Sequence, residues 1–497
     1  MPGSPGGPEP AAAPAGLQLV EESAVRIEDR QLQLAASGRG ARAQLVVRAA
    51  RAEELAGFDG EAGSHQGGYL LVGPRSPRNV ARLRALLSWV APRPLGLQRS
   101  FGFGDRLGLA TPDHVRALRM ARPGLLAIFA QQSIREMTRT RRSPQHVMDD
   151  ASWGVFSSGW HDAHGSDADH VKTADDVEAC AAAGYTMFTF DPGDHVRAVA
   201  DSLAGAELRR ALEGLPWTAM EDSPRSMLER YRRVEPELRE LGIPFGEEAA
   251  ARAAIKYGPA VAHAARLYRR LREVAPPDRE VEISVDETDS PTTHFQHVYI
   301  ATELTRLGLR WVSLAPRFVG RFEKGSDYIG DPAAFEADCA VHAAIARRLG
   351  PYKLSLHSGS DKLSIYAAFR RGTGALGHVK TAGTSYLEAL RTLGRTDPGL
   401  FKEIYEVARR RYGEDRATYN VSARVEAMPE VGRVAGAALP ALLDDFHVRQ
   451  VLHVTFGSAM DRFGERLHEA LNRDLPAYED DLERHFVRHL RAFESPG

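Results

Sequence analysis

Short apolar runs alternate with amphipathic helical patterns along most of this sequence. From residue 124 onward, eight β-prone runs end in polar residues; they lie at 125–132, 153–160, 186–191, 281–288, 311–318, 353–360, 375–382 and 451–457. Strands that alternate with helices are typical of βαβ units and a parallel sheet, and eight of them close a barrel. The pattern predicts an α/β protein with a (β/α)8 TIM-like barrel over residues 124–497. A doubly wound open sheet is the alternative that the pattern leaves open.

The segments outside this pattern have a different character. Residues 17–51 alternate between polar and apolar positions and, with the run at 68–73 and a helical pattern after it, predict a small N-terminal α+β segment over 17–123. Residues 196–279 are charged and helical in periodicity, so we expect a helical insertion there. Residues 1–16 are rich in Pro, Gly and Ala and lack the basic and apolar regions of a signal peptide, which predicts a disordered tail.

The composition of the chain argues against a nucleic acid or a membrane as its partner. The 497-residue chain is 43% hydrophobic and has a formal net charge of -2, whereas nucleic acids and anionic membranes favour a basic surface. No apolar run approaches the roughly 20 residues that span a membrane. Only two cysteines occur, which is typical of a reducing compartment. We therefore expect a soluble cytoplasmic protein with neither nucleic acid nor membrane as partner. A homo-oligomer is a further expectation for its assembly.

Histidines stand at or near the ends of three predicted strands. His357 directly follows the apolar residues of the sixth run. His378 and Lys380 are two positions apart on the seventh run, and His453 and Thr455 have the same spacing on the eighth, so each pair shares one face of its strand. A single histidine on an apolar strand is usually a buried core residue. Several at one rim, where barrel enzymes keep their active sites, favour a functional site.

Acidic residues accompany these histidines. Asp286 and Glu287 follow the apolar residues of the fourth run. Burial of these carboxylates is costly unless they bind a metal or exchange protons. Asp169, His170 and Lys172 follow the second run; an exposed loop before a helix is the alternative there. Imidazole together with carboxylate suits a catalytic divalent cation such as Zn, Mn, Co or Ni, with open positions for substrate.

Four long strings carry a resemblance to a known family. They are S-V-D-E-T-D-S-P-T-T at 284–293, S-L-A-P-R-F-V-G at 313–320, G-P-Y-K-L-S-L-H-S-G-S-D-K at 350–362 and H-V-K-T-A-G-T-S-Y-L-E-A-L-R at 378–391. Together they resemble the tagaturonate epimerase family, and the likeness extends from about residue 124 to the C-terminus. The resemblance implies an isomerase, dependent on a divalent metal, that interconverts D-tagaturonate and D-fructuronate in hexuronate breakdown.

The resemblance and the strand-end residues together suggest roles. The expected ligands of the cation are His170, His357 and His378, with His453 or Glu287 as alternatives to His378. Asp169 and Glu287 are expected to act as acid and base. The residues expected to contact the substrate are Gln132, Glu136, Lys172, Arg317, Ser358, Lys362 and Lys380.

Two chemical routes fit such an epimerisation. The two ketohexuronates differ at a carbon β to the ketone, so simple enolisation does not acidify its C–H bond. Retro-aldol cleavage with re-addition, or proton transfer through successive enediolates, would invert it. Transient oxidation would need a nicotinamide, but the glycines at 102–108 lack the dinucleotide spacing, and we interpret that fragment as a loop. A metal-dependent aldose–ketose isomerase, a sugar aldolase or a non-enzymatic sugar-acid binding protein are the alternatives.

Overall fold

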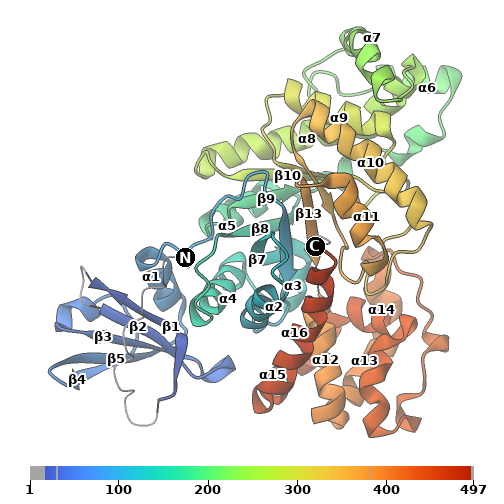
Figure 1. Cartoon of the computed structure of the whole chain (residues 1–497). Coiled ribbons are helices and arrows are strands. Elements are labelled where there is room, and N and C mark those ends of the chain that lie inside the picture. The colour runs from blue at the N-terminus through green and yellow to red at the C-terminus, as the bar shows by residue number, and fades with distance from the viewer. Residues whose placement is uncertain (1–16, 29–31, 382, 494–497) are drawn as a thin grey trace.

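The computed structural model describes residues 17–28, 32–381 and 383–493, so the tail predicted for residues 1–16 lies outside the described residues. Its centre is a closed barrel of parallel strands in the order β10-β11-β12-β13-β6-β7-β8-β9 (Figure 1). In chain order the barrel strands are β6 (Ser100–Gly104), β7 (Leu126–Ser133), β8 (His164–Val171), β9 (Met187–Phe190), β10 (Glu280–Ser284), β11 (Ser313–Ala315), β12 (Lys353–Leu356) and β13 (Gly377–Thr381). The predicted (β/α)8 TIM-like fold is therefore confirmed.

Two of the eight predicted strands are wrong, because their residues form helices. The run at 153–160 lies largely in α4 (Pro144–Ser157), and the run at 451–457 lies in α14 (Phe446–Val454) and the start of α15 (Phe456–Arg473). Helix α4 has a strong start signal, since the Ser143 side chain caps it and a proline occupies its first turn. Both runs are apolar because these helices are deeply buried, and a short apolar run does not distinguish a strand from a buried helix.

The strands that take those two places are β6 and β8. Strand β6, S-F-G-F-G, falls in the fragment that we interpreted as part of a loop and lies before residue 124, where the barrel pattern was expected to begin. Strand β8, H-G-S-D-A-D-H-V, has few apolar residues. Its Asp167 and Asp169 contact the ammonium of Lys380 inside the barrel. A strand with a charged inward face does not produce the apolar run by which strands are recognised.

An antiparallel five-stranded sheet precedes the barrel, in the order β1-β2-β3-β5-β4 (Figure 1). Its elements are β1 (Leu19–Ile27), β2 (Leu32–Ser37), β3 (Gln44–Ala49), β4 (Glu61–His65), β5 (Gly68–Pro74) and the helix α1 (Pro77–Leu86). Buried side chains such as Leu34, Leu45 and Val47 form its core, which Trp153 and Phe156 of α4 complete. The predicted small N-terminal α+β segment is thus present and packs on the outer helices of the barrel.

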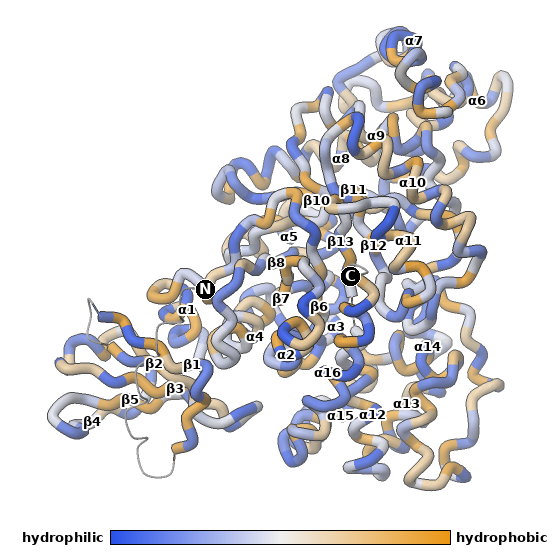
Figure 2. Tube along the Cα trace, viewed as in Figure 1, coloured by the Kyte–Doolittle hydropathy of each residue, from blue (hydrophilic) through white to orange (hydrophobic). Residues whose placement is uncertain are grey.

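Helices surround the barrel and extend beyond it. The range predicted as an insertion contains α6 (Gly205–Glu213), α7 (Pro224–Glu240) and α8 (Glu247–Val274), of which the outlying α7 is mostly hydrophilic (Figure 2). The other helices are α2 (Thr111–Ala121), α3 (Ile134–Thr140), α5 (Ala174–Ala182), α9 (His294–Arg306), α10 (Pro332–Leu349), α11 (Leu363–Thr373), α12 (Thr384–Thr396), α13 (Pro398–Asp415) and α16 (Leu475–Arg491). Among the described residues, no helix has the length and apolar character needed to cross a membrane.

The inside of the barrel is polar, and this positions the site. Strand residues such as Phe188, Ile283 and Leu354 belong to the main apolar core shared with the surrounding helices. Their neighbours point inward, because side chains alternate along a strand. Near the N-terminal ends of the strands, the Ser100 hydroxyl lies 2.9 Å from His378 Nδ1 and 3.3 Å from Lys353 Nζ. A second set of charged side chains lies above this layer, toward the C-terminal ends.

Candidate active site at the C-terminal end of the barrel

Lys380 is the cation at the centre of the upper layer. Its Nζ lies 2.6 Å from Asp167 Oδ2, 2.9 Å from Asp169 Oδ1 and 2.9 Å from Glu282 Oε1. All four side chains are buried. Burial lowers the pKa of Lys380, but the three carboxylates outweigh burial and raise it well above its usual value. The ammonium therefore stays charged and neutralises part of an acidic cluster drawn from β8, β10 and β13.

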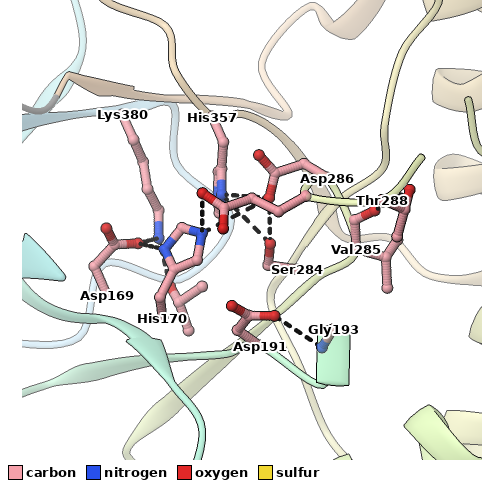
Figure 3. Close-up of polar contacts among 12 residues, drawn as sticks. Asp169, His170, Asp191, Gly193, Ser284, Val285, Asp286, Thr288, His357 and Lys380 are labelled. Carbon is pink, nitrogen blue, oxygen red and sulfur yellow. Dashed lines mark hydrogen bonds and ion pairs between the residues drawn. The ribbon is translucent and has the colours of Figure 1, made fainter. Parts of the chain in front are cut away.

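His170 links this layer to the opening of the barrel (Figure 3). Its Nδ1 lies 2.8 Å from Asp169 Oδ1, and its backbone is left-handed with a φ of 55°. Burial lowers the pKa of His170, but the Asp169 carboxylate more than offsets burial and raises the pKa to about 10. The other ring nitrogen, Nε2, is buried without a hydrogen-bond partner, 3.8 Å from Asp286 Oδ1 and 4.0 Å from Glu287 Oε1.

His357 faces His170 from the other side of the opening, with their ring centroids 5.1 Å apart. Its Nε2 lies 2.6 Å from Glu282 Oε1, and its Nδ1 lies 3.1 Å from Asp286 Oδ1. The Ser284 hydroxyl donates a hydrogen bond to the same Asp286 oxygen. Each imidazole therefore has one nitrogen hydrogen-bonded to a buried carboxylate and the other directed at Asp286. Metal-binding histidines show the same arrangement, because the carboxylate behind the ring fixes its orientation while the other nitrogen faces the ion.

Several groups of these side chains could hold a metal ion. Asp169, His170 and His357 offer ligand atoms within 4.8 Å of one another, and so do His170, Asp191 and Glu287. Imidazole and carboxylate donors suit Zn, Mn, Co or Ni. The buried, unpartnered Nε2 of His170 is the observation that a cation would account for, since buried polar atoms are normally satisfied.

Two open cavities meet this cluster. The larger one encloses about 1510 Å³, including open solvent, and is lined by the acidic and imidazole side chains of His357, Asp286 and Glu287 and by the basic side chains of Arg317, Arg321 and Lys324. Residues 417–420, after α13, also line it. The second encloses about 1060 Å³ beside His170 and Lys172 and shares Glu287 with the first. Glu287 itself keeps 34% of its side-chain surface exposed and pairs with Arg135, whose Nη2 lies 3.0 Å from Oε1.

The structure brings most of the predicted site residues to this region. Those at the cluster or along its cavities are Asp169, His170, Lys172, Glu287, Arg317, Ser358, His357 and Lys380. Lys380 is already surrounded by carboxylates, and Lys172 is half-exposed beside Asp191 and Asp194. Arg317 lines the larger cavity, and its guanidinium forms no hydrogen bond or ion pair with the described residues.

Other predicted residues lie elsewhere. His378 is in the lower layer against Ser100 and joins none of the metal-capable groups found among the described residues. His453 lies on a helix, with Nε2 3.2 Å from Arg106 Nη2, instead of on a strand. Glu136 pairs with the same Arg106. His453 was placed wrongly because helix α14 was misread as a strand, and His378 because of its depth along β13.

Gln132 and Lys362 also face away from the cluster. The Gln132 side chain accepts a hydrogen bond of 3.0 Å from Arg142, whereas its neighbour Gln131 donates to Asp169 at 3.3 Å. Lys362 is fully buried and donates to the carbonyl of Glu323 at 2.9 Å, with Ser326 and Ser360 carbonyls as further acceptors. Burial lowers the pKa of Lys362 to about 8.

Two carboxylates of the cluster, Asp167 and Glu282, were not predicted, and Asp286 was expected to be functional but was given no specific role. A signal for Glu282 and Asp286 was present in the sequence. Glu280, Glu282, Ser284 and Asp286 recur at every second position of an otherwise apolar run, which places them on one face of β10. A polar face on a buried strand indicates a charged barrel interior. The last residues of this face lie at the C-terminal end of the barrel, where the active site forms.

Comparison with known proteins gives a single family. The chain matches the model of the tagaturonate epimerase family, UxaE, over residues 20–493. It is 43% identical over 422 residues to the tagaturonate/fructuronate epimerase of Thermotoga maritima. The aligned residues cover 84% of this chain and 86% of that protein. The native crystal structure of fructuronate-tagaturonate epimerase UxaE from Cohnella laeviribosi matches with a TM-score of 0.87 and 31% identity, over 96% of this chain and 97% of that one. A glycerol complex of the same protein matches with a TM-score of 0.86 and 32% identity, over 96% of each chain. The chain therefore belongs to the tagaturonate epimerase family, a family of isomerases.

Proposed function

We propose that this protein interconverts D-tagaturonate and D-fructuronate, in the breakdown of hexuronates, with the help of a divalent cation. The observation that carries the proposal is the pairing of His170 and His357 across the opening of the barrel, each oriented by a buried carboxylate. The names of the relatives from Thermotoga maritima and Cohnella laeviribosi, whose similarity extends over most of the chain, support the choice of substrates.

The cation would be held by His170 Nε2, His357 Nδ1 and Asp286. Asp286 takes the place that we had expected for His378, because its Oδ1 lies between the two imidazoles, 3.8 Å from one nitrogen and 3.1 Å from the other. Asp169 and Glu282 would fix the orientation of the histidines from behind. When bound, such a cation would polarise the ketone and hydroxyl oxygens of the sugar.

The substrate carboxylate would bind at the basic side chains of the larger cavity. Arg317, Arg321 and Lys324 line it together with the acidic residues, and an arginine fork matches a carboxylate in two hydrogen bonds. Arg317 is the first choice, since Arg321 Nη1 lies 3.5 Å from Glu323 Oε1. An elongated sugar acid would then span the cavity, with its ketone end at the histidines.

Glu287 is the group that we assign to proton transfer. Burial raises its pKa, but His170 and Arg135 outweigh burial and lower it, so Glu287 is ionised at neutral pH. It lines both cavities and can take the proton of the hydroxyl on the inverted carbon. In the retro-aldol route the adjacent carbon–carbon bond then breaks, its electrons pass to the ketone fragment as an enediolate, and the hydroxyl carbon becomes an aldehyde. The aldehyde turns, the enediolate carbon re-forms the bond on its other face, and Glu287 returns the proton to the new alkoxide. Asp169, previously expected to share this role, is instead assigned to orient His170.

Proton NMR of chelator-stripped protein with tagaturonate in deuterium oxide, with and without added divalent metals, tests this function. Metal-dependent formation of fructuronate is the expected result. Deuterium at the inverted carbon would favour proton exchange there, and its absence would favour carbon–carbon cleavage. No conversion with any of the four metals would contradict the proposal, and turnover of an aldose or release of a three-carbon fragment would point to the isomerase or aldolase alternatives.

A further inference from the structure

A second cluster of imidazole and carboxylate groups lies outside the barrel, between α9 and α10. His294, the first residue of α9, places Nε2 3.0 Å from Asp338 Oδ1 on α10. His342, one helical turn after Asp338, places its own Nε2 3.6 Å from the same oxygen. The three ligand atoms lie within 4.8 Å of one another. Donors at the usual 2.0–2.1 Å from a tetrahedral zinc ion are about 3.3 Å apart, so the observed spacings suit one ion.

His342 has an unsatisfied nitrogen directed into this cluster. The residue is completely buried, and its Nε2 has no hydrogen-bond partner. At 3.6 Å the Asp338 oxygen is too distant for a hydrogen bond. A buried imidazole nitrogen without a partner is uncommon, and it therefore needs a physical explanation.

A chain of hydrogen bonds behind His342 can leave this nitrogen ready to bind a cation. His342 Nδ1 lies 2.8 Å from His297 Nδ1, and His297 Nε2 lies 2.8 Å from the Tyr352 hydroxyl. If His342 donates from Nδ1 to His297 Nδ1, and His297 donates from Nε2 to Tyr352, both hydrogen bonds are satisfied. The lone pair of His342 Nε2 then faces Asp338.

From this geometry we propose that His294, Asp338 and His342 bind a second divalent transition-metal ion, of the zinc type, that is structural in role. His294 is partly exposed, with 35% of its side chain accessible, which gives the ion a path from solvent and leaves room for a water ligand. The proposal does not depend on the function proposed above.

Such an ion would brace one wall of the larger cavity. The second oxygen of Asp338, Oδ2, accepts a hydrogen bond of 3.1 Å from the backbone N–H of Val319, in the loop after β11. Two residues earlier, the backbone of Arg317 exchanges hydrogen bonds with Thr292, just before α9. Both loops line the cavity, so an ion at the cluster would fix the segment that carries Arg317.

A third cluster, Asp361 with His485 and His489, serves as a contrast. There Arg449 Nη2 lies 2.6 Å from Asp361 Oδ2, and Arg488 lies 3.7 Å from the other oxygen. The carboxylate already has cationic partners, and a metal ion would be repelled by them. At the His294 cluster, no arginine or lysine among the described residues forms an ion pair with Asp338.

Zinc binding to tag-free, chelator-stripped protein tests the inference, with bound metal measured by mass spectrometry after gel filtration. The wild type is expected to retain two equivalents. The variants His294→Ala and His342→Ala should each lose one equivalent, whereas His161→Ala, which removes an exposed histidine outside the metal-capable groups, should lose none. His294→Ala is the more tolerant variant if the buried His342→Ala fails to fold.

The His357→Ala variant separates the two metal proposals. It should retain the equivalent at the outer cluster, and zinc should still raise its melting temperature, an effect that the added substitution His294→Ala abolishes. Full zinc retention by His294→Ala would overturn the inference. A single equivalent that is lost with His357 alone would overturn it too, while leaving the metal at the barrel opening supported. A single equivalent lost only with His294 would support it and count against the metal proposed for catalysis.

Discussion

Lys380 on β13 places its Nζ 2.6 Å from Asp167 Oδ2 on β8, three strands away around the barrel. Asp169 and Glu282 contact the same ammonium, so a single cation holds together three buried carboxylates. Removal of one partner from a buried ion pair costs about 3–5 kcal/mol, because the remaining charge is left uncompensated. We expect Lys380→Met to lower the free energy of unfolding by about this amount, measured by urea denaturation.

Lys172→Met is the matched control for that substitution. Its side chain is 40% exposed and its ammonium pairs with Asp194 at 3.1 Å, so its loss should change stability by less than about 1 kcal/mol. Equal unfolding midpoints for Lys380→Met and the wild type would contradict the central role of Lys380.

Glu282 is expected to control how tightly His357 holds a cation. Its Oε1 lies 2.6 Å from His357 Nε2, and loss of such a partner typically weakens metal binding about 10–100-fold. Glu282→Gln should therefore weaken metal binding by that factor in a competition assay with a metal-sensitive dye. Glu280→Gln, two residues earlier on the same strand face, should leave the affinity unchanged, and an equal loss in both variants would refute the specific contact.

Glu287→Gln keeps the shape of the side chain but removes its ability to accept a proton. General acid–base groups typically contribute about 10²–10⁴ in rate, so we expect kcat to fall by about that factor while metal content stays normal. Asp289→Asn, at the same cavity, should retain most of the activity. A Glu287→Gln enzyme with wild-type kcat would remove Glu287 from proton transfer.

Arg317→Met tests recognition of the substrate carboxylate. A hydrogen bond to a charged group contributes about 1.5–3 kcal/mol, which corresponds to a loss of about 10–150-fold in kcat/KM. The kcat/KM of Arg317→Lys should lie between those of the wild type and Arg317→Met, because lysine keeps the charge but not the two-pronged geometry. The exposed Arg310→Met is the control; if it affects kcat/KM as much as Arg317→Met, the carboxylate is not bound at Arg317.

Buried histidines should make the fold sensitive to acid, and His114 is a clear case. Burial lowers its pKa to about 4, against 6.5 for an exposed histidine. Between these values the unfolded chain binds more protons than the folded one, so the free energy of unfolding falls as the pH decreases. The contribution of neutral His114 is complete above pH 6.5 and is lost as the pH falls toward 4. The full loss corresponds to about 3 kcal/mol.

The substitution His114→Phe isolates that contribution. The ring of His114 stacks on Phe103 and contacts Phe486, so phenylalanine can occupy the same aromatic site. The variant should show a shallower decrease in unfolding free energy between pH 6.5 and 4 in urea titrations than the wild type. Parallel curves for the two proteins would contradict the assignment.

The sequence was informative where strand faces are apolar and less so where they are charged. The runs around Phe188, Ile283 and Leu354 predicted barrel strands because their outward faces pack on helices. Strand β8 was missed since Asp167 and Asp169 occupy its inward face. The apolar run at 451–457 was misread because α14 is buried on nearly all sides, which removes helical periodicity.

The same limit applied to the candidate site. His357 could be recognised because it follows a strand, where barrel sites form. His170 was selected correctly although the run before it is helix α4, and it lies within the missed strand β8. The depth of a residue along a strand is not visible in the sequence, so His378 was grouped with them although it contacts Ser100 in the lower layer. Side-chain direction at a strand end is equally hidden, which is why Gln132 was chosen although Gln131 is the neighbour of Asp169.

The most direct test of the proposed site is anomalous X-ray diffraction, at the metal absorption edge, from crystals containing the cation and tagaturonate or fructuronate. We predict an anomalous peak bounded by His170 Nε2, His357 Nδ1 and Asp286, with sugar oxygens beside it and the sugar carboxylate at Arg317. A fully occupied sugar site without an anomalous peak at these residues, or with its carboxylate away from Arg317, would contradict the proposed active site.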